Sequence, residues 1–203
     1  MTERDVLRVL VEQLALERIE ENLFRGQSQD LGWGTVFGGQ VLGQALSAAV
    51  HTVPSERQVH SLHAYFLRPG DVTRPIVYDV DRIRDGGSFT TRRVRAIQNG
   101  QPIFNMSASF QVPEVGFEHQ DEMPKVAHPD SLPTEAERIA PHLEKLPAGM
   151  RERAAYARPF ELRVADADDE LRFQTKPRPP TRNVWLRAKG TLPDDLQRTL
   201  IHG

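Results

Sequence analysis

Apolar residues at the start of the chain recur at the spacing of a helix that has one hydrophobic face. They are Val6, Leu7, Leu10, Val11 and Leu14. Thr2 and Asp5 stand at the spacing of a capping box, so the pattern predicts an amphipathic helix over residues 3–18. A short strand is predicted at residues 22–28.

The segment 36–50, with the sequence VFGGQVLGQALSAAV, is helical in pattern but contains three glycines. A glycine inside a helix costs about 1 kcal/mol relative to alanine. The cost is offset if a sheet curls around the helix, because the helix must then present small side chains where the strands approach. The sequence therefore predicts a central helix that is apolar nearly all round. The alternative is an ordinary amphipathic helix in which the glycines have no packing role.

Polar and apolar residues then alternate with the period of a strand through most of residues 60–112. Strands are predicted in the segments 60–71, 75–83, 89–98 and 102–112, and residues 68–71 form a turn at the end of the first. The dipeptide Asn99-Gly100 favours the positive φ angles of a tight hairpin. The last three strands read as an antiparallel meander, which together with the central helix predicts an α+β fold.

The rest of the chain, from residue 113 onward, has a different pattern. Residues 113–157 are rich in proline, with short helices predicted at 134–146 and 149–156. Alternation returns in the segments 158–165 and 182–190, where two strands are predicted, and a helix is predicted to begin at residue 192.

Composition narrows the classes of function. The 203 residues carry a formal net charge of −2 and include no cysteine. Near neutrality argues against nucleic acid as a partner, and the absence of cysteine excludes disulfides and thiol nucleophiles. The N-terminal residues read neither as a signal peptide nor as a membrane-inserting segment, so the expected location is cytoplasmic.

Four segments together closely resemble the N-terminal half of type II acyl-CoA thioesterases, the family of bacterial TesB and its peroxisomal relatives. Their sequences are LFRGQSQDLGWGTVFGGQVLGQAL, VHSLHAYFLRPGD, PIVYDVDRIRDGGSFTTRRVRAIQNGQPIF and SASFQVPEVGFEHQ. The resemblance continues through the linker into NVWLRAKGTLPDDL. It implies a double hotdog, in which each antiparallel sheet wraps a long helix. The implied organisation is a hotdog domain at 1–115, a linker at 116–157, and a second, incomplete hotdog at 158–203.

The resemblance also implies an activity. Family members hydrolyse fatty acyl-CoA to free fatty acid and CoA without cofactor or metal, and they assemble into oligomers, so a homo-oligomer of hotdog domains is expected. Their catalytic Asp, Thr and Gln would lie beyond Gly203, so no catalytic residue is assigned in this chain. The alternative function is a non-catalytic hotdog module that binds acyl-CoA or assembles with other subunits.

The residues considered for substrate binding are Gly38, Gly39, Gln40 and His60. Uncovered amides at a helix N-terminus can receive a carbonyl oxygen or oxyanion, although tight packing explains the glycines equally well. His60 is predicted to share a strand face with Leu62, where it contacts substrate or is a hydrogen-bonded core histidine.

Other chemistries find little support in the sequence. His60 and His63 are three positions apart on a strand, so they point to opposite faces and do not form a metal site. A serine-hydrolase G-x-S-x-G motif is absent. Three arginines on one strand could contact CoA phosphates, but ion pairs with Asp79 and Asp81 are the preferred interpretation. These arginines are Arg92, Arg93 and Arg95.

Overall fold

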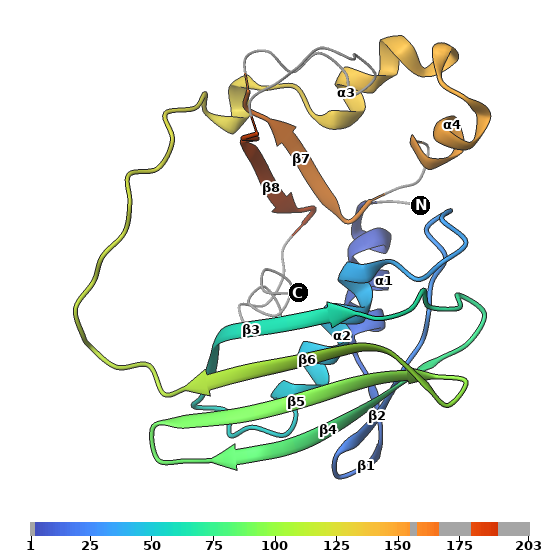
Figure 1. The fold of residues 1–203 in the computed structure, drawn as a ribbon. Coiled ribbons are helices and arrows are strands. Elements are labelled where there is room, and N and C mark those ends of the chain that lie inside the picture. Colours follow the sequence, from blue (N-terminus) through green and yellow to red (C-terminus); the bar gives the residue numbers. More distant parts are fainter. Residues whose placement is uncertain (1–2, 155–157, 167–179, 191–203) are drawn as a thin grey trace. The chain divides into compact units, whose positions relative to one another are not determined.

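The computed structural model describes residues 3–154, 158–166 and 180–190, which belong to two compact units (Figure 1). Among the described residues, the first unit spans 9–116, and the second groups 3–8 with 117–154, 158–166 and 180–190. The first unit contains the end of α1 (Glu3–Leu14), α2 (Gly38–Val50) and strands β1 (Glu17–Glu20), β2 (Leu23–Gly26), β3 (Gln58–Phe66), β4 (Ile76–Asp85), β5 (Phe89–Gln98) and β6 (Gln101–Gln111).

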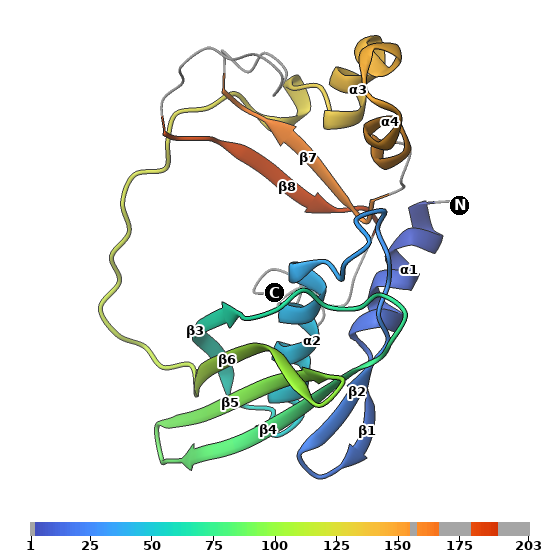
Figure 2. The same cartoon turned by 45° about the vertical axis from the view of Figure 1, so that its right-hand side comes forward.

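The six strands form one antiparallel sheet in the order β1-β2-β4-β5-β6-β3. The sheet curls around α2, which contacts β2, β3, β4, β5 and β6 (Figures 1 and 2). Ala45, Leu46 and Ala48 of α2 are fully buried at this contact. Strand residues that close the core around them include Phe24, Ile76, Val94, Phe104, Met106 and Phe110. The sequence prediction of a sheet wrapped around this helix is confirmed.

The side of α2 that faces the N-terminal segment is polar, contrary to the prediction of a helix apolar nearly all round. Gln40, Gln44 and Ser47 follow helical spacing on this side and are all buried. Gln44 Nε2 donates to the carbonyl oxygens of Gln13 (2.7 Å) and Gln27 (3.0 Å), and Ser47 Oγ donates to that of Leu14 (2.9 Å). Each polar group thereby satisfies a carbonyl at the end of α1 or after β2, which a methyl group could not do.

Tyr78 completes this polar cluster from β4. Its hydroxyl donates to Gln44 Oε1 at 2.7 Å, so the whole amide of Gln44 is engaged. Burial raises the pKa of the Tyr78 phenol well above its usual value, which keeps the hydroxyl protonated and available as a donor. The cluster joins α1, β2 and β4 to a single helix position.

The predicted first helix extends too far. It ends at Leu14, and residues 17–20 form the exposed strand β1 instead. Pairing with β2 and the ion pair between Glu17 and Arg25 (2.5 Å) stabilise the strand. These partners lie across a hairpin, so the spacing of apolar residues within the segment could not reveal them.

The three glycines of α2 lie against side chains from three different segments of the chain. A Cβ built on Gly43 would lie 3.0 Å from Leu14 Cδ2, and one on Gly39 would lie 2.5 Å from the ring of Phe37. Only Gly38 approaches a strand residue, because its Cβ would lie 3.1 Å from the ring of Phe66. The prediction that strands account for all three glycines is therefore wrong for Gly39 and Gly43.

The second unit contains η1 (Pro129–Ser131), α3 (Glu135–Ile139), η2 (Ala140–Lys145), α4 (Ala148–Ala154) and the antiparallel pair β7 (Phe160–Val164) and β8 (Val184–Ala188). A capping box between Thr134 and Glu137 starts α3. Arg163 of β7 donates to the carbonyl oxygens of Pro129 and Leu132. The short helices and both strands agree with the sequence predictions, whereas the helix expected from residue 192 lies outside the described residues. The domain boundaries at 115 and 157 stay predictions.

Gly26 provides a test of the polar cluster. Its Cβ would lie 2.7–2.8 Å from the amide atoms of Gln44, which cannot move without losing three hydrogen bonds. We expect Gly26→Ala to lower the free energy of unfolding by about 2 kcal/mol, measured by urea denaturation. Gly87→Ala is the matched control, since nothing lies within 4 Å of a Cβ there, and a change within about 0.5 kcal/mol is expected. Equal effects of the two substitutions would contradict this account.

Candidate active site

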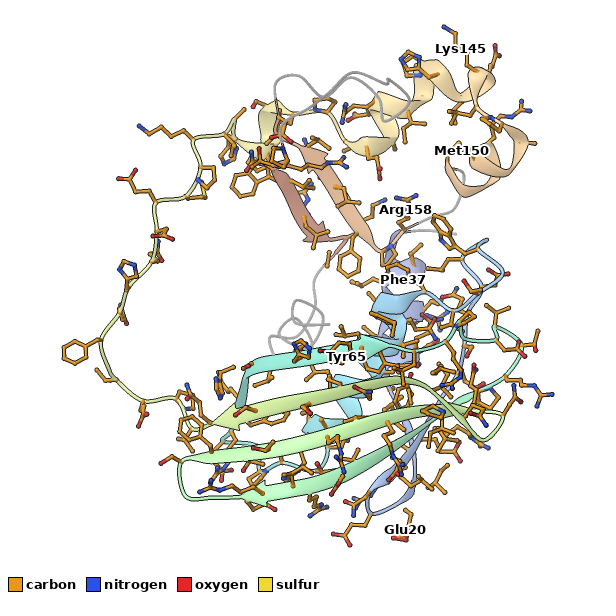
Figure 3. All side chains as sticks on the ribbon, in the orientation of Figure 1. Glu20, Phe37, Tyr65, Lys145, Met150 and Arg158 are labelled. Carbon is orange, nitrogen blue, oxygen red and sulfur yellow. The ribbon has the colours of Figure 1, made fainter. Side chains whose placement is uncertain are left out.

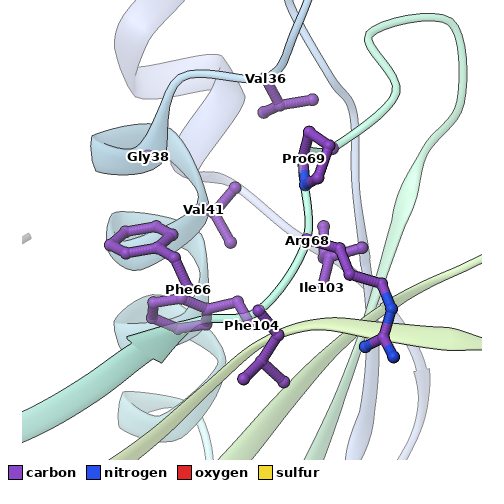
Figure 4. Close-up of a pocket in the computed structure, with 10 residues that line it drawn as sticks. Val36, Gly38, Val41, Phe66, Arg68, Pro69, Ile103 and Phe104 are labelled. Atoms are coloured by element: carbon purple, nitrogen blue, oxygen red, sulfur yellow. The ribbon is translucent and has the colours of Figure 1, made fainter.

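A pocket of about 360 Å³ opens beside the first turn of α2 (Figure 4). Its back wall is made of buried apolar side chains, namely Val36, Val41, Ile103 and Phe104. Its rim is made of more exposed residues at the end of β3 and in the following turn, namely Phe66, Leu67, Arg68 and Pro69. Gly38 and Gly70 complete the lining. The size and the apolar walls are those of a small-molecule site.

Backbone hydrogen bonds fix the rim of the pocket to its walls. The amides of Leu67 and Arg68 both donate to the carbonyl oxygen of Ile103, at 2.8 and 3.1 Å. The amide of Val36 donates to the carbonyl oxygen of Gly70 at 3.0 Å. A Cβ on Gly70 would lie 3.0 Å from Val36, so glycine permits the turn and the segment before α2 to approach this closely. The pocket is thus held open by main-chain contacts.

The N-terminus of α2 lies at the pocket through Gly38, and its first amides are uncovered. Phe37 is the N-cap residue and offers no side-chain cap, and the amides of Gln40 and Val41 are the first to bond, both to Phe37 O. Within the described part of the chain, the amides of Gly38 and Gly39 donate to no acceptor. Such amides, at the positive end of the helix dipole, can receive a carbonyl oxygen or an anion.

Asp30 organises the glycine-rich loop that leads into α2. Its Oδ1 accepts hydrogen bonds from the amides of Gly32 (2.8 Å), Trp33 (3.0 Å) and Gly34 (3.2 Å). These bonds, that from Gly34 foremost, lower the pKa of the Asp30 carboxyl. Gly34 needs its positive φ of 69° to close the turn.

The four residues proposed from the sequence lie in different places. Gly38 lines the pocket. Gly39 is not part of the lining and lies beside the ring of Phe37 at the first turn of α2. Gln40 is buried, and its Nε2 donates to the carbonyl oxygen of Gln27 at 2.8 Å, so its side chain holds the segment after β2.

His60 does not share a face with Leu62, contrary to the sequence prediction. It is the extra residue of a β-bulge, since Val59 pairs with Phe110 and Ser61 with Ser109. Its Nε2 lies 2.8 Å from Ser109 Oγ, and Ser109 alternates with the buried residues of β6. His60 is therefore on the outer side of the sheet, away from α2. Its role in substrate binding stays a prediction.

The arginines of β5 divide between the two faces of the sheet. Arg93 and Arg95 form exposed ion pairs with Asp81 (2.7 Å) and Asp79 (2.5 Å), as the preferred interpretation held. Arg92 instead points inward and is 1% exposed. It binds Asp85 Oδ1 (2.6 Å) and the main-chain and hydroxyl oxygens of Thr52, just beyond α2. None of the three lines the pocket.

The sequence interpretation missed most of the pocket. The sequence places Phe66, Ile103 and Phe104 on strands but does not show that they line one pocket. Phe66 and Phe104 are register partners on neighbouring strands, and their ring centroids lie 4.9 Å apart. The turn at 68–71 was recognised, but its approach to Val36 was not. Over the described ranges, no cluster of His, Cys, Asp or Glu could hold a metal ion, and no helix is long and apolar enough to cross a membrane.

Comparison with known proteins identifies the family of this chain. Residues 28–111 match the family model of the acyl-CoA thioesterase N-terminal domain. The chain is 44% identical to acyl-CoA thioesterase 2 of Haemophilus influenzae, over 95% of this chain and 67% of the relative. The chain belongs to the type II acyl-CoA thioesterase family. Human acyl-coenzyme A thioesterase 8 is 38% identical, over 92% of this chain and 60% of its own length.

Solved structures agree with this family assignment. The acyl-CoA thioesterase II TesB2 of Mycobacterium marinum superposes with a TM-score of 0.69 at 38% identity, covering 95% of this chain and 68% of that one. A hot dog fold protein from Alicyclobacillus acidocaldarius superposes with a TM-score of 0.70 at 21% identity, over 96% and 68% of the two chains, and supports the fold alone. The chain spans about two thirds of the length of these bacterial proteins and 60% of the human thioesterase.

The Asp30 carboxylate allows a test by pH. Its pKa is lower in the folded protein than in the unfolded chain, so its contribution to stability is present above about pH 4 and is lost as pH falls through the folded pKa. We expect Asp30→Ala to destabilise the protein at pH 7, and the difference from the parent to shrink below about pH 4 in thermal denaturation. In the control Asp121→Ala, which removes a fully exposed carboxylate, we expect little destabilisation at pH 7. If the stability difference between Asp30→Ala and the parent is the same at pH 3 as at pH 7, the ionised carboxylate of Asp30 does not stabilise the fold.

Proposed function

We propose that the protein hydrolyses fatty acyl-CoA thioesters to free fatty acid and CoA. The 44% identity to acyl-CoA thioesterase 2 over nearly the whole of this chain carries the proposal. The pocket beside α2 supports it, because apolar walls adjoin two amides without acceptors. In this arrangement the acyl chain lies against Val41 and Ile103, and the thioester carbonyl oxygen faces the amides of Gly38 and Gly39.

The helix N-terminus suits the charge that develops in thioester hydrolysis. Water attacks the carbonyl carbon, the oxygen becomes an oxyanion, and collapse of the tetrahedral intermediate breaks the C–S bond. The water proton passes to a general base, and CoA leaves as a thiol. Amides fixed at the start of α2 would stabilise the oxyanion without reorganising. The family resemblance gives the base and the water-orienting groups as Asp, Thr and Gln residues, none of which is assigned to a position in this chain.

The second candidate is a module that binds acyl-CoA without turning it over. This candidate is supported by the pocket lining, which includes no carboxylate among the described residues. These residues would supply binding and oxyanion contacts but no base. The expected homo-oligomer and the cytoplasmic location stay predictions. One feature supports association with a further hotdog: β3 lies at the end of the strand order, so within the described sheet one of its edges has no partner.

A thiol-release assay separates the two candidates. The chain has no cysteine, so every thiol that reacts with a chromogenic disulfide reagent comes from CoA. Release of CoA from palmitoyl-CoA supports the hydrolase, whereas calorimetric binding of palmitoyl-CoA without release supports the binding module. Absence of both would defeat both candidates.

The oxyanion role of Gly38 can be isolated by two substitutions. Gly38→Pro removes the amide hydrogen at the first helical position, where proline is tolerated, and the extended Phe37 (φ −64°, ψ 131°) has the conformation that a following proline requires. Gly38→Ala adds a comparable Cβ but keeps the amide. We expect kcat of Gly38→Pro to be about 100-fold or more below that of Gly38→Ala. Equal rates for the two variants would remove Gly38 from the oxyanion site.

A further inference from the structure

Phe66 has an unusual position for a large aromatic side chain. It is the last residue of β3 and is paired with the fully buried Phe104, yet it is 60% exposed. Its ring packs against Phe104 at a centroid distance of 4.9 Å and an angle of 55°. On its other side, ring atoms Cε1 and Cζ lie only 3.1 Å from where a Cβ of Gly38 would be, so the ring is seated on the bare first turn of α2 (Figure 4).

This seat puts the ring next to the place where the reacting carbonyl would lie. The Gly38 amide that would receive the carbonyl oxygen belongs to the residue that the ring touches. The first carbons of an acyl chain extending from that carbonyl into the pocket therefore pass the ring before they reach the back wall.

We propose that Phe66 is a specificity-determining residue that selects against acyl groups branched at carbon 2, and this rests on the proposed function. A methyl branch at carbon 2 needs space beside the carbonyl. The back wall cannot give that space, because Val41 and Ile103 are 4% and 5% exposed in a closely packed core and the main chain of Ile103 is fixed to Leu67 and Arg68. The branch must displace the Phe66 ring, which lies between Gly38 and Phe104.

The principal experiment compares kcat/KM for unbranched and 2-methyl acyl-CoA of equal chain length. For Phe66→Ala, we expect the ratio of branched to unbranched kcat/KM to rise about tenfold, which is the effect of one methyl group in an apolar pocket. Phe66→Leu keeps an apolar side chain of intermediate size and is expected to give a smaller rise. An unchanged ratio in both variants overturns the proposal.

Tyr65→Ala is the matched control. Tyr65 is on the same strand and is also 60% exposed, but it pairs with Asn105, contacts His63 and does not line the pocket (Figure 3). We expect the ratio of branched to unbranched kcat/KM for Tyr65→Ala to equal that of the parent protein. A rise equal to that of Phe66→Ala would show a general effect of removing an aromatic side chain from β3 and would overturn the proposal.

A binding measurement distinguishes failure of this inference from failure of the proposed function. The probes are non-hydrolysable 2-oxoalkyl-CoA thioethers, unbranched or with a methyl group on the carbon that follows the carbonyl, titrated by calorimetry. Preference for the unbranched probe that is lost in Phe66→Ala supports the inference even where no CoA is released from a true thioester. Turnover by the parent with equal affinity for both probes overturns the inference and leaves the thioesterase standing. If neither probe binds the parent protein, both the inference and the proposed function are overturned.

Discussion

The enclosure of α2 by the sheet is the constraint on which the rest of this structure depends. On each side of a helix that is surrounded by strands, the size and polarity of the side chains must suit the segment that packs there. Alanines and Leu46 meet the strands, and Gln44 and Ser47 meet the main-chain carbonyls of the N-terminal segment. An unpaired buried carbonyl is unfavourable by about 1–3 kcal/mol, so the polar side of α2 is as necessary to the packing as the apolar side.

The pocket follows from how this enclosed helix begins. Because Phe37 supplies no cap and the next two residues are glycines, the helix starts without side chains that would cover its first amides. The turn after β3 is tied to β6 and to Val36, and it lines the pocket together with Gly38. Val41 and Ile103 next to these amides are 4% and 5% exposed, and a hydrogen bond beside such apolar groups is stronger than one in water.

The described residues of the pocket offer an apolar lining and main-chain donors without acceptors. Among them, the lining includes no acid or base other than Arg68, whose Nη1 donates to the carbonyl oxygen of Pro102. The chain covers 67% of the Haemophilus influenzae thioesterase and 68% of the Mycobacterium marinum TesB2. Phe66 is the aromatic side chain of this lining that packs against Gly38.

The amino-acid sequence by itself determined the features that depend on neighbours along the chain. Alternation located β3, β4, β5 and β6, and Asn99-Gly100 specified the hairpin with φ angles of 51° and 71°. The small residues of α2 indicated the enclosing sheet. The family resemblance supplied the hotdog fold and the activity, and the glycines at the start of α2 pointed to the end of the helix where the pocket lies.

Only the tertiary structure decided the features that depend on pairing between distant segments. The bulge at His60 turned that side chain to the outer face, and the hairpin with β2 made a strand of β1. The hydrogen bonds of Gln44 to Gln13 and Tyr78, the hydrogen bonds of Arg92 to Thr52 and the packing of Phe66 on Gly38 each join residues more than 20 positions apart. Periodicity assigns a residue to a face of its own element, but register, bulges and hydrogen-bond partners are set by the free energy of the whole packed sheet.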